Sequence, residues 1–187
     1  VIHFDTSILK LGQNEITLST QYSENFSGLE IIYLLGHFGV RHDKKGTAIC
    51  DLPKTLNIGD WTNQKLPFYS GHVNYLCETK VNKKNGERVF LKLPEYFGTA
   101  VKIFVNNKNA GIIAWQPNEI DITDYLSGSL TQINIQILGH RRNSHGPFHG
   151  GKQWFEWTGP SQFLHKDNAY QLVPCGLMKA PEILYKV

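Results

Sequence analysis

The stretch Gly98–His149, GTAVKIFVNNKNAGIIAWQPNEIDITDYLSGSLTQINIQILGHRRNSHGPFH, carries the clearest pattern in the chain and decides the fold. Apolar residues recur at every second position over residues 101–105 and again over 133–137, which is the period of a strand with one buried face. The residues of Asn106–Asn109 tolerate positive φ angles, so they predict a hairpin turn. We therefore expect strands whose inward side chains are Val101, Ile103, Val105, Ile133, Ile135 and Ile137.

Shorter elements lie between and after these two strands. Gly111–Trp115 predicts a returning strand, Glu119–Ile122 another, and Thr123–Leu126 a capped single turn. The last strand runs into His140–His149, a loop rich in hydrogen-bond donors and poor in residues that pack. Polar, glycine-containing loops at the end of a hydrophobic scaffold are the usual place for function.

The rest of the chain repeats the pattern of short strands separated by turns, and no stretch shows a sustained helical period. We expect Val73–Val81 to pair with Arg88–Leu93, and Leu29–Val40 to be a buried strand rather than a helix. The fold class is therefore all-β, an antiparallel β-sandwich of two sheets packed face to face with less than about a tenth helix. The remaining expected strands are Val1–Phe4, Glu15–Tyr22, Thr47–Leu52, Tyr170–Met178 and Pro181–Tyr185.

Composition and charge narrow the class of protein. The 187 residues, 41% of them hydrophobic, suffice for one core, so we expect a single domain over 1–187 in which 1–27 are an extension or the remnant of a preceding domain. The formal charge of +3 comes from scattered lysines, so we expect no nucleic-acid partner. No long apolar run predicts a membrane span, and a chain that starts at Val1 without a signal peptide suggests a fragment or a processed chain.

Three cysteines cannot all pair within the chain. Cys50 and Cys77 lie in apolar, strand-like stretches and are expected to be buried thiols, although a Cys50–Cys77 disulfide stays open if their strands are neighbours. The cysteine count leaves the redox compartment undecided.

The order of these motifs resembles a known family. FVNNKNAG (104–111), WQPNEIDITDYL (115–126) and GHRRNSHGPFH (139–149) follow LEIIYLLGHFGV (29–40), Asp60-Trp61 and PFYSG (67–71). Together they resemble the C-terminal sugar-binding, galactose-binding-domain-like β-sandwich of family-two-type and α-L-rhamnosidase-like bacterial glycoside hydrolases. The resemblance covers residues 28–150 well and implies a jelly roll, an accessory module beside a catalytic barrel. It favours a secreted or periplasmic location.

The loop His140–His149 has three interpretations. A metal site is one, because two of its histidines are four residues apart, but the intervening Gly-Pro disfavours the helix that this spacing needs. Bracing of the loop against the neighbouring sheet by Arg141, Arg142 and Asn143 is the second. Sugar recognition is the third, since hydroxyl groups need donors and acceptors at fixed angles.

Aromatic residues add to the third interpretation, because the C–H face of a pyranose stacks on flat rings. Core packing explains Trp61 and Trp115. Trp154 and Trp157 flank Glu156 in a glycine-rich segment, so we expect them on an exposed loop. The predicted carbohydrate contacts are Arg142, Asn143, His145, Trp154, Glu156 and Trp157.

Catalysis would need a pair of carboxylates flanking the scissile bond. Glu119 and Asp121 share one face of a strand, but Asp121 is better explained as a turn cap. No pair stands out, and there is no nucleophile elbow, phosphate loop or dinucleotide motif. We therefore expect the isolated chain to be non-catalytic, with no cofactor and no metal.

Three hypotheses follow. The first is a non-catalytic carbohydrate-associated module that binds glycan or shapes the cleft of a catalytic domain in the same parent chain. The second is a purely structural sandwich. The third, the least favoured, is a glycosidase in its own right that uses Glu156.

Overall fold

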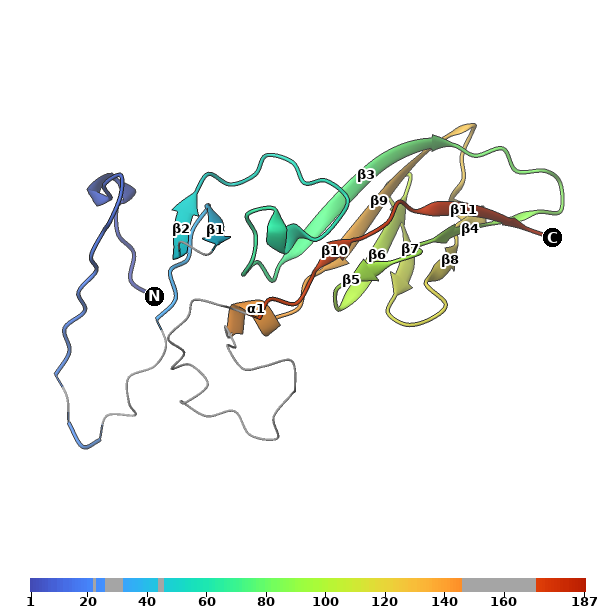
Figure 1. Ribbon diagram of the computed structural model, residues 1–187. Helices are drawn as coiled ribbons and strands as arrows, with labels where there is room; N and C mark the ends of the chain where they lie inside the picture. Colours follow the sequence, from blue (N-terminus) through green and yellow to red (C-terminus); the bar gives the residue numbers. More distant parts are fainter. Residues whose placement is uncertain (22, 26–31, 44–45, 146–170) are drawn as a thin grey trace. The chain divides into compact units, whose positions relative to one another are not determined.

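The computed structural model describes residues 1–21, 23–25, 32–43, 46–145 and 171–187 (Figure 1). The chain divides into two compact units, Val1–Gly36 and His37–Val187. The described part of the first unit contains one short 3-10 helix, η1 (Thr6–Ile8), capped by Asp5, whose carboxylate accepts a hydrogen bond from the Ser7 amide at 2.8 Å.

Two strands predicted in the first unit are wrong. Val1–Phe4 and the described residues of Glu15–Tyr22 are irregular. The side chains of Ile16 and Leu18 are 59% and 51% exposed, so the apolar alternation there has no surface to cover. Alternation predicts a strand only where a partner strand and a core exist.

The second unit is an all-β sandwich with antiparallel pairing throughout its sheets. A four-stranded sheet has the order β3-β9-β6-β7, a three-stranded sheet the order β11-β4-β8, and two small sheets pair β1 with β2 and β10 with β5. The strands are β1 (Gly39–Asp43), β2 (Gly46–Cys50), β3 (His72–Lys80), β4 (Arg88–Lys92), β5 (Tyr96–Phe97), β6 (Ala100–Val105), β7 (Lys108–Ile113), β8 (Glu119–Asp121), β9 (Leu130–Leu138), β10 (Gly176–Leu177) and β11 (Glu182–Lys186).

The helical segments of this unit are short, as the sequence predicts. They are η2 (Trp61–Asn63), η3 (Thr123–Tyr125) and α1 (Arg142–His145). No helix among the described residues is long and apolar enough to cross a membrane.

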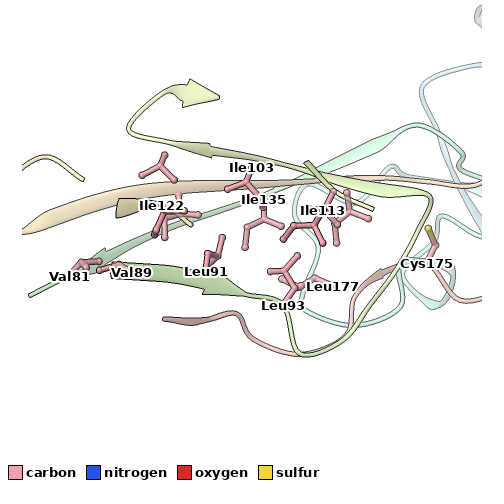
Figure 2. Packing of buried hydrophobic residues seen from close by; sticks show 14 of the residues in the cluster. Val81, Val89, Leu91, Leu93, Ile103, Ile113, Ile122, Ile135, Cys175 and Leu177 are labelled. Carbon is pink, nitrogen blue, oxygen red and sulfur yellow. The ribbon is translucent and has the colours of Figure 1, made fainter. Parts of the chain in front are cut away.

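The core lies between the four-stranded and three-stranded sheets. Figure 2 shows Ile103 and Ile135 directed into the same interior as Val89 and Leu91. The six side chains predicted to point inward are confirmed, because each is at most 2% exposed. Burying an aliphatic side chain stabilises the fold by about 1.5–3 kcal/mol, so these strands account for much of the driving force.

The predicted hairpin turn is confirmed and is tighter than expected. β6 ends at Val105 and β7 begins at Lys108, so Asn106 and Asn107 alone form the turn, with φ angles of 48° and 65°. These angles match the type I′ turns that fit the twist of a hairpin. The side-chain oxygen of Asn106 also accepts from the Gln132 amide at 3.0 Å, which ties the turn to β9.

A register shift follows in the same hairpin. Phe104 pairs with Asn109 and Ile103 with Gly111, so Ala110 is left without a partner as a bulge. Gly111 has a φ of 136°, and a Cβ there would lie 2.7 Å from the Ile120 side chain of β8. The two sheets approach each other so closely here that only glycine fits.

The expected pairing of Val73–Val81 with Arg88–Leu93 is wrong. β3 pairs with β9, whereas β4 pairs with β8 and β11 in the other sheet. Val81 is buried and its amide donates to the Ser129 carbonyl at 3.1 Å, so the chain stays with the four-stranded sheet before it crosses. β3 and β4 are therefore consecutive in the sequence but lie in different sheets, and they form no hairpin.

The strand predicted over Leu29–Val40 is displaced. Its described residues 32–38 are irregular, and β1 instead begins at Gly39 and runs to Asp43, beyond the end of the predicted strand. A Cβ on Gly39 would lie 2.7 Å from the Asp51 carbonyl, and the Val40 amide donates to Lys65 at 2.8 Å. Contacts distant in sequence thus decide where this strand begins.

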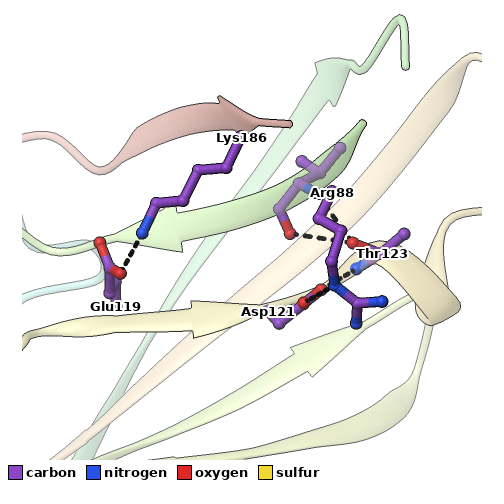
Figure 3. A network of polar contacts seen from close by, with 6 residues as sticks. Arg88, Glu119, Asp121, Thr123 and Lys186 are labelled. Atoms are coloured by element: carbon purple, nitrogen blue, oxygen red, sulfur yellow. Dashed lines mark hydrogen bonds and ion pairs between the residues drawn. The ribbon is translucent and has the colours of Figure 1, made fainter. Parts of the chain in front are cut away.

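The outer face of the three-stranded sheet carries paired charges (Figure 3). Lys186 bonds Glu119, the Arg88 Nε lies 2.5 Å from the Asp121 carboxylate, and Lys92 lies 3.7 Å from Glu182. Register places them on one surface. We call this surface the charged face, and it consists of Arg88, Lys92, Glu119, Asp121, Glu182 and Lys186.

The outer face of the four-stranded sheet is different in kind. Gln136 donates to Asn74 at 3.1 Å and Gln132 to Glu78 at 2.7 Å, while exposed apolar side chains lie between them. We call this surface the amide face, and it consists of Asn74, Leu76, Glu78, Lys102, Phe104, Ile112, Gln132, Asn134 and Gln136.

Candidate functional site

The predicted site loop leaves the sandwich where β9 ends, and it begins with the single helical turn α1 (Figure 1). We call this region the α1 end, and it comprises residues 59–62, 139–144 and 173–177. Asn143 on α1 is 4% exposed. Its side-chain amide donates to the Val173 carbonyl at 2.8 Å, and its oxygen accepts from the Val173 amide at 2.9 Å. Asn143 therefore ties α1 to Val173. This is a bracing role like that of the second interpretation, but its partner is an irregular segment and not the neighbouring sheet.

Of the other predicted contact residues, the structure describes the side chain of Arg142 alone. Arg142 is half-buried on α1, next to the exposed Arg141, whose carbonyl accepts from the Ser144 hydroxyl at 3.1 Å. His145 ends α1, but its side chain lies outside the described residues, as do His149, Trp154, Glu156 and Trp157. The structure thus brings Arg142 and Asn143 together on one turn.

Asp60 is the residue that organises the α1 end. Its Oδ1 accepts from the Thr62 amide at 2.9 Å and from the Cys175 amide at 3.1 Å. Its Oδ2 accepts from the Thr62 hydroxyl at 2.6 Å and from Asn63 at 3.0 Å. An aspartate before a helical turn is a typical N-cap, so the cap could be predicted from the sequence. The bond to Cys175, which lies far along the chain, could not.

Backbone bonds complete this junction. The Trp61 amide donates to the Cys175 carbonyl at 2.8 Å and the Gly59 amide to the Leu177 carbonyl at 2.7 Å. A Cβ on Gly176 would lie 2.5 Å from the Gly59 carbonyl. Residues 173–177 are therefore held on one side by Asn143 and on the other by the segment around Asp60.

Trp61 is in the core, as predicted. Its side chain is fully buried and meets Tyr69 edge to face, with ring centroids 6.1 Å apart. Its Nε1 has no hydrogen-bond partner among the described residues, and the same is true of the buried Nδ1 of His140, whose Nε2 lies 3.4 Å from the Pro174 carbonyl. Within the part of the chain that the structure describes, these are two buried ring nitrogens at the α1 end without a partner.

Cys175 supplies packing at this junction. Burial raises the pKa of its thiol to about 11, against the opposing effect of a hydrogen bond from the His140 backbone. The thiol is therefore neutral near pH 7 and a poor nucleophile. Among the described residues, no three metal-ligating side chains gather.

Two sequence expectations about cysteines and tryptophans need correction. Trp115 is 78% exposed, not in the core, because β7 ends at Ile113 and the chain leaves the sheet before the alternation could turn the indole inward. Cys77 is exposed, not buried, because β3 is an edge strand. Cys50 is half-buried in a different sheet, and both thiols are free.

The carboxylates on β8 have structural partners. Glu119 and Asp121 share a face, as predicted, but each pairs with a cation. Asp121 also accepts from the Thr123 amide at 2.9 Å, which confirms its predicted role in the turn, although the N-cap of η3 is Ile122, whose side chain makes no cap bond. Burial acts to raise the pKa of Asp121, yet hydrogen bonds from Thr123 and Arg88 outweigh it, so the pKa lies below its usual value.

Comparison with known proteins finds the fold in parts of larger chains. A rhamnosidase from Novosphingobium sp. PP1Y matches with 18% identity and a TM-score of 0.54, covering 91% of this chain and 16% of that chain. A glycosyl hydrolase family 2 member from Bacteroides cellulosilyticus DSM 14838 matches at 14% identity, TM-score 0.43, over 76% of this chain and 17% of that chain. A beta-galacturonidase from Eisenbergiella tayi matches at 17% identity, TM-score 0.41, over 80% and 22%.

No protein-family model and no curated protein sequence matches the chain. The likeness to the rhamnosidase shows a shared fold, and this chain spans about a sixth of the length of that protein. The chain is therefore an all-β sandwich of a kind found inside a much larger rhamnosidase.

Proposed function

We propose that the chain is a non-catalytic β-sandwich module of a larger glycoside hydrolase, of the galactose-binding-domain-like, jelly-roll kind found in family-two and α-L-rhamnosidase-type enzymes. The observation that carries the proposal is the alignment with the rhamnosidase, which takes in 91% of this chain but 16% of that one. A module shared among larger proteins gives such a match. Residues 1–27 are then an extension that precedes the sandwich.

In this proposal the module binds glycan or packs against the catalytic domain of the same parent chain. Its contact residues are Arg142, His145, Trp154, Glu156 and Trp157, which follow one another after β9. Support comes from α1, whose position is fixed by the two hydrogen bonds between Asn143 and Val173. We assign Asn143 to positioning, because both its donor and its acceptor are used within the chain.

Glycan arrays and titration calorimetry on the 187-residue chain test this role. We expect weak binding, since a sugar exchanges hydrogen bonds with water for bonds with protein at little net gain. If stacking dominates, Trp154→Ala loses more affinity than Arg142→Ala. Arg141→Ala, a change in the exposed neighbour of Arg142, is the matched control and should bind normally.

Hydrolysis assays test the non-catalytic assignment. The chain should leave aryl glycosides of the common sugars intact, whereas the full-length parent protein should hydrolyse a glycoside. Turnover by the isolated chain that disappears in Glu156→Gln would overturn the assignment and favour an autonomous glycosidase.

A purely structural module is the second candidate. The observation in its favour is that the polar groups of Asp60 and Asn143 form hydrogen bonds with other residues of the chain. It would be supported if arrays and calorimetry detect no glycan while the parent protein still hydrolyses its substrate.

A further inference from the structure

Trp115 lies outside the core of the described residues. Its side chain is 78% exposed and follows β7 in the short connection to β8. Single exposed apolar residues are common on protein surfaces, so exposure alone does not indicate a site. The surroundings of Trp115 decide what its indole can do.

The backbone that carries Trp115 is held on both sides. The Tyr96 hydroxyl donates to the Ile113 carbonyl at 3.4 Å, and the Leu93 amide donates to the Asn118 carbonyl at 2.8 Å. Pro117 fixes its own φ angle, and its carbonyl accepts from the Glu119 amide at 2.8 Å. The indole is thus presented by a short, fixed connection, which lowers the entropy cost of binding a ligand.

The side chains next to this indole are amides. Gln116 is exposed and Asn118 is half-buried, and neither side chain forms a hydrogen bond with another residue in the described part of the chain. The side chains of Asn143 and Gln136 differ, because each bonds within the chain. Two amide side chains that have no hydrogen-bond partner among the described residues therefore follow the exposed indole within three positions.

The carboxylates that adjoin the residues holding this connection are paired with lysines. Glu95, beside Tyr96, pairs with Lys179 at 2.9 Å, and Glu119, beside Asn118, pairs with Lys186. The surface around Trp115 is therefore apolar at the ring and neutral at the amides.

We propose that Trp115, Gln116 and Asn118 form a subsite for one neutral sugar ring, with the indole stacked on the C–H face and the amides bonded to hydroxyls. The proposal deepens the glycan-binding role and rests on it. A specific protein partner needs about 800 Å² on each side, far more than one indole and two amides provide. One pyranose matches a single indole in size, and the paired charges favour a neutral sugar over an acidic one.

Nuclear magnetic resonance on the ¹⁵N-labelled chain tests the subsite. The indole N–H signal of Trp115, identified by its loss in Trp115→Phe, is followed during titration with methyl α-L-rhamnoside, methyl β-galactoside and glucuronate. We expect the neutral glycosides to shift this signal and glucuronate to shift it less. Trp115→Ala should weaken binding by about tenfold or more, the loss typical of an aromatic anchor, and Gln116→Ala should weaken it less.

Leu76→Ala is the matched control, because Leu76 is exposed to the same degree on the amide face and should leave affinity unchanged. Sugar-induced shifts elsewhere, with the Trp115 signal unmoved and Trp115→Ala binding normally, would overturn the subsite and leave the glycan-binding role intact. If none of the glycosides shifts any signal, the subsite is overturned too. Hydrolysis of a glycoside by the full-length parent protein then tests separately whether the chain belongs to a glycoside hydrolase. Signal changes that depend on protein concentration alone would show self-association at Trp115 and also contradict the subsite.

Discussion

The two main sheets bury similar aliphatic side chains on their inner faces but present different outer faces. The charged face completes its own pairing, because each of its cations pairs with a carboxylate on another strand. Figure 3 shows the pairs made by Arg88 and Lys186. On the amide face the buried Oδ1 of Asn134 has no partner among the residues that the structure describes, and Leu76 and Ile112 are exposed. The first surface is held by ion pairs, whereas the second is held by hydrogen bonds from amide side chains, although it also carries Glu78 and Lys102.

The buried side chains and the surface ion pairs contribute differently to the stability of the sandwich. Surface ion pairs contribute about 0–1 kcal/mol each, whereas each buried aliphatic side chain contributes about 1.5–3 kcal/mol. The charged face therefore modulates a stability that the shared interior supplies. Substitutions inside the sandwich, at its seam and on its outer faces should rank in that order.

Leu91→Ala should give the largest loss. Leu91 is 1% exposed on β4, the central strand of the three-stranded sheet, so truncation leaves a cavity costing about 2–5 kcal/mol. Urea denaturation followed by circular dichroism measures it. Leu76→Ala, on the amide face and 77% exposed, is the control and should change the free energy of unfolding by less than about 0.5 kcal/mol. Equal losses in the two variants would contradict the assignment of the inner and outer faces.

Gly111→Ala should come next. An alanine at this position would have to keep the positive φ of 136°, and its Cβ would lie 2.7 Å from the Ile120 side chain. We expect the free energy of unfolding to fall by about 2 kcal/mol. Gly128→Ala is the matched control, since Gly128 also has a positive φ of 72° but nothing within 4 Å of a Cβ. If both changes lower the thermal unfolding midpoint equally, the close approach of Gly111 to Ile120 adds nothing to the cost of the alanine Cβ.

Asp121→Asn should give the smallest loss, about 0.5 kcal/mol after allowance for solvent screening. The pKa of the Asp121 carboxyl is lowered in the folded protein, so its contribution is present above the unfolded value of 3.8 and is lost as pH falls through the lower folded value. Unfolding experiments at pH 7 and pH 3 in low salt should show the difference between wild type and variant shrinking in acid. Gln136→Ala on the amide face should show no such pH dependence, and a pH-dependent effect there would erase the contrast between the faces.

The sequence predicted the centre of the sandwich better than its edges. Alternation located β6 and β9 because both strands lie inside one sheet with one face in the core. It failed for Glu15–Tyr22, where the side chains of Ile16 and Leu18 are exposed, and for the partner of β3, because the passage of the chain from one sheet to the other after β3 leaves no trace in local spacing. Turn chemistry was the other dependable signal, as Asn106 and Asn107 show.

The sequence identified residues of the candidate site better than it identified what each residue does there. Asn143 was expected to contact sugar or to brace the loop, and the structure shows the brace, which depends on Val173, distant in the sequence. Trp115 was assigned to the core from its strand-like context, although the strand ends two residues earlier. The end of a strand depends on tertiary packing, so exposure near that end could not be predicted from alternation.

The two bonds between Asn143 and Val173 join residues that lie 30 positions apart in the chain, and they use both polar atoms of one side chain. The link between α1 and the residues that precede β10 therefore depends on a single amide. A change at Asn143 would release this link without touching the aliphatic side chains between the two main sheets. The end of the sandwich and its interior can therefore vary independently of each other.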